Sequence, residues 1–517
     1  MLNGQKILPN VYRDSVGLMR ISVALCELPG VVQAAMVMAS EGNMELLREA
    51  GLIGKGSAAA PNDLLIAIQA RDQDSIDDAL NAAEASLAGN EKDNAGGATT
   101  VLLPRSTEMA LDEFPEANLA LISCPGEYAG AEAQKALRLG LDVMIFSDNV
   151  AVEEEVALKR LAQESGRLVM GPDCGTAIIN GVPLGFANTV APGDIGIVAA
   201  SGTGLQQVTC LIDNLGCGIS QAIGTGGRDL SAAVGGLTML KGLEILACDD
   251  STRVIVLISK PPATDVARQV MARARDCGKP VVVNFLGGAN TMWEGNICHA
   301  ETLEQAAHMA VDMSQGENPS ARTLPRHHLA ETELSRLISS LPNTRKYVRG
   351  LFSGGTFSYE AMVLLENNIG PVNSPSPLKI AQKLNDPWTS SGNTVLDLGD
   401  DVFTRGRPHP MIDHRLRHDR LLQEVHDRET AVILLDTVIG HGSHADPANE
   451  VAASIIASRQ SAEQDGSAPI FIVFVCGTKR DPQNLVRQEE ILRDAGAIVV
   501  ENNAQAARLA GDIFLGR

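Results

Sequence analysis

The sequence predicts an α/β protein with parallel sheets, divided into several domains. Strand-like apolar runs alternate with helical segments from residue 119 onward, which is the pattern of βαβ units. The apolar runs are continuous, as in strands buried on both faces. The order of strands and glycine-rich loops in residues 193–315 recurs in residues 346–517. A chain of 517 residues is also too long for a single core.

Composition shifts and turn signals divide the chain into five segments. They are a small N-terminal α/β unit (1–95), a Rossmann-like domain (100–192), a first flavodoxin-like module (193–315), a polar linker (316–345) and a second flavodoxin-like module (346–517). The N-terminal unit has predicted strands at 31–38 and 63–68, and the polar, glycine-rich stretch 89–100 predicts a linker after it. The Rossmann-like domain has predicted strands at 119–123 and 142–146.

Composition and charge argue against several classes of partner. The net charge is −21 and aromatic residues make up 3% of the chain, which argues against nucleic acid and against an anionic membrane. No apolar run reaches the length of about 18 residues that a membrane span needs. The nine cysteines are scattered, without a Cys-x-x-Cys pair, which favours a reducing compartment. We therefore expect a cytoplasmic protein.

Two glycine-rich loops each follow an apolar run and open a helical segment. A strand, turn and helix in this order point backbone N–H groups and the positive helix end at an anion. The same residues could instead be an ordinary helix cap with small residues for packing. The candidate anion-binding residues are Ser201, Gly202, Thr203 and Gly204 in the first loop and Ser353, Gly354, Gly355 and Thr356 in the second.

Further candidates follow other strands of the two modules, at the edge where open α/β sheets bind ligands. Arg228 offers a guanidinium for a carboxylate or phosphate, or it could brace its own loop. Lys260 could add charge or lie in a solvated turn, and the histidines after residue 440 could touch the anion or lie on a surface loop. The candidates are Gly226, Gly227, Arg228, Lys260, His441, Gly442, Ser443 and His444.

The segment 400–413 gathers carboxylates, guanidiniums and an imidazole. Pro408 and Pro410 restrict the backbone on both sides of His409. A histidine with a pKa near neutrality can act as a general acid or base. We predict His409, Arg407, Asp400 and Asp401 as catalytic residues, although a rigid loop with internal salt bridges is the alternative. No second cluster of ligands supports a metal site, so we expect none.

Several motifs resemble succinyl-CoA synthetase. Residues 170–175 (Met-Gly-Pro-Asp-Cys-Gly), 193–198 and 201–203 resemble its α subunit, and residues 395–399 and 432–447 resemble the ligase domain of its β subunit. With residues 12–16 and 406–413, the chain resembles the FdrA family over nearly its whole length. The resemblance implies a CoA-binding-type domain at 100–192. It also implies two ligase modules that pack together as a pseudo-symmetric pair.

The resemblance implies two enzyme functions. Residues 287–295, where succinyl-CoA synthetase carries its phosphate-relay histidine, contain no histidine. The resemblance to the FdrA family, some of whose members are assigned as carbamoyltransferase subunits, then implies an FdrA-type subunit of a carbamoyltransferase in ureide and purine nitrogen catabolism, with phosphate or carbamoyl phosphate as ligand and no firm cofactor. The alternatives are an acid–CoA ligase subunit that binds CoA and a carboxylic acid, and a non-catalytic ligand-sensing subunit. The expected partners are a small carboxylate or ureide substrate and other protein subunits of an oligomeric complex.

Overall fold

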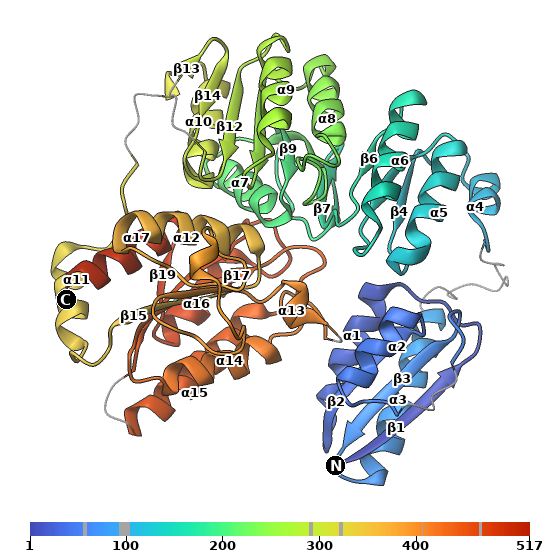
Figure 1. The fold of residues 1–517 in the computed structure, drawn as a ribbon, viewed down its shortest axis with the longest axis horizontal. Coiled ribbons are helices and arrows are strands. Elements are labelled where there is room, and N and C mark those ends of the chain that lie inside the picture. Colours follow the sequence, from blue (N-terminus) through green and yellow to red (C-terminus); the bar gives the residue numbers. More distant parts are fainter. Residues whose placement is uncertain are drawn as a thin grey trace. The chain divides into compact units, whose positions relative to one another are not determined.

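The computed structural model describes residues 1–54, 59–92, 104–288, 293–319, 324–405, 407–464 and 468–516. It divides into two compact units (Figure 1). The first comprises Met1–Arg167 with Phe403–Pro408, and the second comprises Leu168–Val402 with His409–Arg517. No helix in the described ranges is long and apolar enough to cross a membrane.

The N-terminal part of the first unit is a three-stranded antiparallel sheet of order β1-β3-β2 with three helices. Its elements are β1 (Leu2–Leu8), α1 (Ser15–Cys26), β2 (Val31–Met38), α2 (Glu41–Glu49), β3 (Leu64–Ala70) and α3 (Gln73–Lys92). The strand β1 escaped the sequence analysis because its residues alternate only weakly between apolar and polar. The predicted linker 89–100 begins within α3, and residues 93–100 lie outside the described residues.

The second part of the first unit has the expected Rossmann-like alternation. Its elements are α4 (Thr107–Glu113), β4 (Leu119–Ile122), α5 (Gly126–Arg138), β5 (Asp142–Ile145) and α6 (Val152–Glu164). The strands β4 and β5 pair in parallel. The chain then enters the second unit through β6 (Val169–Met170).

The second unit contains the two predicted modules, each built on a parallel sheet. In the first module the parallel strands have the order β10-β9-β11-β12-β14. The strands are β9 (Pro192–Ala200), β10 (Ile219–Gly224), β11 (Val254–Ser259), β12 (Val281–Phe285) and β14 (Ile297–His299), with α7 (Gly202–Asn214), α8 (Leu237–Cys248), α9 (Thr264–Arg275) and α10 (Leu303–Ser314).

Three short strands extend this sheet at its edges. The hairpin of β7 (Thr176–Ile179) and β8 (Val182–Gly185) pairs antiparallel with β10, and β13 (Trp293–Glu294) pairs antiparallel with β14. Strands on both sides of residue 192 therefore hydrogen-bond within one sheet. Residues 289–292 of the predicted relay-loop region lie outside the described residues.

In the second module all strands are parallel, in the order β16-β15-β17-β18-β19. The strands are β15 (Tyr347–Phe352), β16 (Thr394–Asp397), β17 (Thr430–Val438), β18 (Ile470–Cys476) and β19 (Ile498–Val500). The helices are α11 (Glu331–Ser340), α12 (Gly355–Ile369), the 3-10 turn η2 (Ile380–Gln382), α13 (Asp401–Thr404), α14 (Arg415–His426), α15 (Pro447–Gln464), α16 (Leu485–Asp494) and α17 (Asn503–Leu515). The helix α11 lies inside the segment predicted as a linker.

The two modules share one strand order, which confirms the predicted repeat and the flavodoxin-like architecture. The last helices also correspond. Thr302 caps α10 by accepting the Gln305 N–H, and Asn502 caps α17 by accepting the Gln505 N–H. A single core of buried apolar side chains, including Ile197, Val256 and Phe474, runs through both modules. The two modules therefore pack against each other, as expected.

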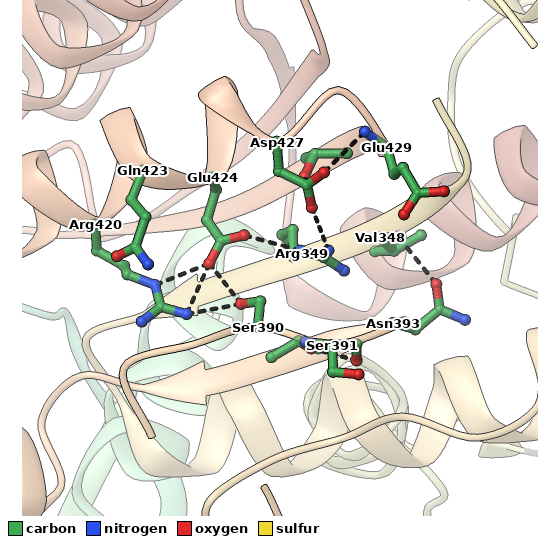
Figure 2. Close-up of polar contacts among 12 residues, drawn as sticks. Val348, Arg349, Ser390, Ser391, Asn393, Arg420, Gln423, Glu424, Asp427 and Glu429 are labelled. Carbon is green, nitrogen blue, oxygen red and sulfur yellow. Dashed lines mark hydrogen bonds and ion pairs between the residues drawn. The ribbon is translucent and has the colours of Figure 1, made fainter. Parts of the chain in front are cut away.

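A buried ionic cluster lies at the edge of the second sheet where its strands begin (Figure 2). Arg349 on β15 donates to Glu424 at 2.9 Å and to Asp427 at 2.8 Å. Glu424 also accepts from Arg420 at 2.8 Å and from the Ser390 hydroxyl at 2.5 Å. Ser390 belongs to the long connection between α12 and β16, so the cluster fixes that connection to the sheet, at the edge opposite the ligand edge.

Candidate functional site

The N-termini of α7 and α12 meet where the parallel strands of both modules end. The Ser201 hydroxyl accepts the Gly204 N–H at 2.9 Å and lies 2.5 Å from the Thr356 hydroxyl of α12. A Cβ on Gly354 would lie 2.6 Å from Cγ2 of Thr203, so only glycine permits this approach. The predicted loops after β9 and β15 thus form one structure.

The N-terminus of α12 carries the features of an anion site. Its cap residue, Gly354, has no side chain that could accept a hydrogen bond from the first turn. Two charged groups border the next residue: a Cβ on Gly355 would lie 2.4 Å from Oδ2 of Asp397 and 3.1 Å from Nζ of Lys260. Lys260 follows β11 in the first module, and Asp397 ends β16 in the second. The site therefore draws a cation, a carboxyl group and a helix end from both modules.

Asp397 is a partly buried carboxyl group with a perturbed pKa. Burial raises the pKa of Asp397 to about 6, and the charges of Asp400 and Asp436 act in the same direction. Lys260 and the Gly399 N–H, which donates to Oδ1 at 3.0 Å, act in the opposite direction. A carboxyl group with this pKa exchanges protons near neutral pH.

His409 lies beside Asp397, with one ring nitrogen fixed. Its Nδ1 accepts the Met411 N–H at 3.2 Å, so the neutral ring carries its proton on Nε2. A Cβ on Gly399 would lie 2.6 Å from Nε2 of His409 and 3.2 Å from Oδ1 of Asp397. The Phe186 ring packs at 5.9 Å between centroids from that of His409.

The expected near-neutral pKa of His409 is wrong. Burial, reinforced by the positive charge of Arg417, lowers the pKa of His409 to about 4. The imidazole is therefore neutral at pH 7. It can donate a hydrogen bond from Nε2 to an oxyanion, but it does not carry a positive charge there.

A series of buried polar groups fixes the position of Ser353. Asp436, at 0% exposure, accepts the Ser353 N–H at 2.9 Å and the Ser353 hydroxyl at 2.5 Å. Arg417 donates to Asp436 at 2.8 Å and contacts Nδ1 of His414 at 2.9 Å. These contacts set the position of Ser353 at the entrance to α12.

The loop after β17 anchors other parts of the site. The His441 N–H donates to the Ala187 carbonyl at 2.8 Å, and Nε2 of His441 lies 3.1 Å from the Thr189 hydroxyl. The His444 N–H donates to the Met411 carbonyl at 2.9 Å. The Ser443 hydroxyl donates to the Gly440 carbonyl at 2.8 Å. These contacts hold both the segment that carries Phe186 and the turn that carries His409.

A Cβ on Gly442 would lie 2.8 Å from the Phe186 ring, so this glycine makes room for the aromatic side chain. The loop therefore supports the site through protein contacts.

Two residues of the loop after β10 have a structural role. Asp229 accepts the Thr238 N–H at 3.1 Å and the Met239 N–H at 2.9 Å, and so caps the start of α8. A Cβ on Gly226, where φ is +84°, would lie 2.2 Å from the Pro172 carbonyl oxygen. Gly227 and the half-buried Arg228 continue this loop beside the turn of residues 171–173.

The remaining predicted catalytic residues are Asp400, Asp401 and Arg407. Asp400 accepts the Val402 N–H at 3.1 Å and contributes charge near Asp397. Asp401 is exposed at the start of α13. Arg407 is exposed, and its segment groups with the first unit. Among the described residues, no group of three or more His, Cys, Asp or Glu could hold a metal ion.

The sequence analysis missed Asp397, Asp436 and Phe186. Asp397 ends β16 and Asp436 lies near the carboxyl end of β17, so the rule that ligand sites lie at strand carboxyl ends could have identified them. No pattern marks Phe186, which reaches His409 only through packing.

Two family models match the chain. A model described as CoA-ligase matches residues 351–513, and a model described as AllF, heavy metal-associated domain, matches residues 1–101. The residues of the second match do not fit a metal site. They include one cysteine, Cys26, and no histidine, and Sγ of Cys26 accepts the Ala34 N–H at 3.1 Å.

The chain is similar to two subunits of CoA ligases. Succinate–CoA ligase [ADP-forming] subunit alpha 2 of Archaeoglobus fulgidus is 27% identical over 38% of this chain and 71% of its own length. The sulfoacetate–CoA ligase subunit SauD of Bilophila wadsworthia is 26% identical over 38% of this chain and 68% of its own length. A dinucleotide-forming acetyl-coenzyme A synthetase of Ca. Korarchaeum cryptofilum has a TM-score of 0.33 at 15% identity, covering 77% of this chain and 83% of its own.

The parallel sheets, the facing helix ends and the family match define a CoA-ligase-like α/β protein, similar to the α subunit of succinyl-CoA synthetase. The protein YahF of Escherichia coli K12, itself uncharacterized, is 43% identical over 98% of both chains. The chain belongs to the YahF family.

Proposed function

We propose that the chain is the ligase component of an acid–CoA ligase, and that its site joins an acyl phosphate to CoA. The main support is the convergence of the N-termini of α7 and α12 with Lys260, which suits a phosphate group. The similarity to CoA ligases supports the same chemistry. The comparisons do not support carbamoyl transfer, so the alternative stated from the sequence becomes the main proposal.

The reaction at this site would be an acyl transfer. The sulfur of CoA attacks the acyl carbon, the bond from that carbon to the phosphate oxygen breaks, and the thiol proton ends on the released phosphate. Lys260 and the first-turn N–H groups of α12 would bind the phosphate oxygens. His409 would donate its Nε2 proton in a hydrogen bond to the oxyanion that develops on the acyl group.

The proposal extends to the subunit that forms the acyl phosphate and to the acid that is used. An FdrA-type complex would place the nucleotide-dependent formation of the acyl phosphate on another subunit, and the acid would be a small carboxylate. The acyl transfer itself needs only acyl phosphate and CoA, so the full chain can be tested alone.

The test measures thioester formation by the purified chain from CoA and either acetyl phosphate or succinyl phosphate. We expect one thioester for each phosphate released. We expect Lys260→Met to lower kcat/KM by about 10- to 100-fold, because a charge-assisted contact contributes about 1.5–3 kcal/mol. Lys241→Met is the matched control, since Lys241 pairs with Glu244 on the surface of α8.

Two results would contradict the proposal. The first is an absence of thioester with both acyl phosphates together with an absence of phosphate binding. The second is consumption of carbamoyl phosphate without CoA, which would restore the carbamoyl-transfer hypothesis.

A further inference from the structure

We propose that Asp397 is the proton-transfer residue of this site: it takes the thiol proton of CoA and delivers it to the departing phosphate. The inference rests on the proposed function, and it adds a catalytic residue that the sequence analysis did not identify.

The placement of Asp397 is the first argument. Its Oδ2 borders the position where a side chain on Gly355 would stand, at the uncapped end of α12, and Nζ of Lys260 borders the same position. An anion bound by this helix end and Lys260 would therefore lie against the Asp397 carboxyl group. Its other oxygen accepts the Gly399 N–H, which fixes the plane of the carboxyl group.

The surroundings of Asp397 are the second argument. The charged and titratable groups near it are Lys260 after β11, Asp436 on β17, Asp400 after β16, and His409. The carboxylates of Asp400 and Asp436 raise the pKa of Asp397 and the charge of Lys260 lowers it. His409 is neutral at pH 7. The pKa of Asp397, at about 6, lies close to the second pKa of phosphate, so a proton passes between the two groups at little cost.

The proton balance follows directly. The thiol gives its proton to Oδ2 of Asp397 as the sulfur–carbon bond forms. The carbon–oxygen bond to phosphate then breaks, and the leaving phosphate oxygen takes the proton from Asp397. The carboxylate is regenerated, and no other reactant is required.

The first experiment measures thioester formation from acetyl phosphate and CoA as a function of pH, with the full chain. The parent rate should rise through a pKa near 6 as Asp397 loses its proton. The Asp397→Asn variant should no longer show this rise in rate with pH. Its kcat should be lower by about 100-fold or more, the size expected for a positioned acid–base group. Asp397→Glu should restore part of the rate. The control Asp265→Asn removes an exposed carboxylate of α9 and should leave the profile unchanged.

The second experiment measures the binding of inorganic phosphate by calorimetry in two buffers of different ionisation enthalpy. Phosphate beside Asp397 raises its pKa, so the parent chain should take up a proton between pH 6 and 7. Asp397→Asn should bind phosphate as tightly or more tightly, with less proton uptake than the parent, because only the phosphate itself can then change its protonation. A residue with only a structural role would instead weaken binding when changed.

The outcomes separate the two proposals. If the parent chain binds no phosphate and forms no thioester, the proposed function fails. If the parent chain forms thioester while Asp397→Asn keeps both the rate and its rise with pH, the function stands and the role of Asp397 is refuted. Equal proton uptake in parent and variant would also refute it.

Discussion

Glu360 should make the stability of the paired modules dependent on pH. This carboxyl group lies on α12 and is 1% exposed, and it accepts the Leu303 N–H of α10 and the Asn503 amide of α17, each at less than 3 Å. Burial raises its pKa from 4.5 to about 7, and the negative charge of Glu304 adds to the effect. The Glu360 side chain therefore links helices of both modules, and its burial favours the protonated, neutral carboxyl group.

The proton bound to Glu360 in the folded chain determines whether stability rises or falls with pH. Between pH 4.5 and 7 the folded chain holds a proton on Glu360 that the unfolded chain has lost, so the stability contribution is complete below pH 4.5 and declines as the pH rises to 7. A shift of about 2.5 pKa units corresponds to about 3 kcal/mol. Glu360→Gln keeps a neutral amide at this position, so the variant should gain stability relative to the parent as the pH rises.

The assay is urea unfolding of parent and Glu360→Gln at half-unit steps from pH 4.5 to 8. Their difference in the free energy of unfolding should change by about 3 kcal/mol over this range, in favour of the variant at high pH. Glu366→Gln removes a carboxylate from the same helix and is the matched control. A difference between parent and Glu360→Gln that is constant with pH would refute the reasoning.

Three further outcomes are expected. Arg349→Met should lower the free energy of unfolding in urea by about 3–5 kcal/mol, because it leaves Glu424 partly unpaired in the interior. The surface control Lys346→Met should lower it by less than about 1 kcal/mol, and equal losses would contradict the role of the cluster. Gly354→Val should abolish phosphate binding, because its Cβ would stand 2.6 Å from Thr203, and calorimetry that shows parent affinity would contradict the close approach. His409→Ala should lower thioester formation by a similar factor at every pH from 6 to 9, because the pKa of His409 is about 4; a new pH dependence in that range would show that the ring is charged there.

The sequence by itself determined the architecture of the two modules. Continuous apolar runs such as β17 and β18 are typical of strands buried on both faces, and their regular alternation with helical segments indicates parallel βαβ units. The ordered repeat predicted a common strand order, and the Ser201 and Ser353 loops were correctly predicted to lie at strand carboxyl ends. These features are local or periodic, so a single sequence displays them.

Only the tertiary structure decided how the site is composed. Lys260 and Asp397 are far apart in the chain and meet because the edges of two sheets face each other across the N-termini of α7 and α12. The pKa of His409 was predicted wrongly because burial and the charge of Arg417 act through space and leave no trace in the local sequence. Phe186 reaches His409 from another module for the same reason. Sequence patterns report which residues end a strand, but the distances between strand ends, and the dielectric around them, arise from packing.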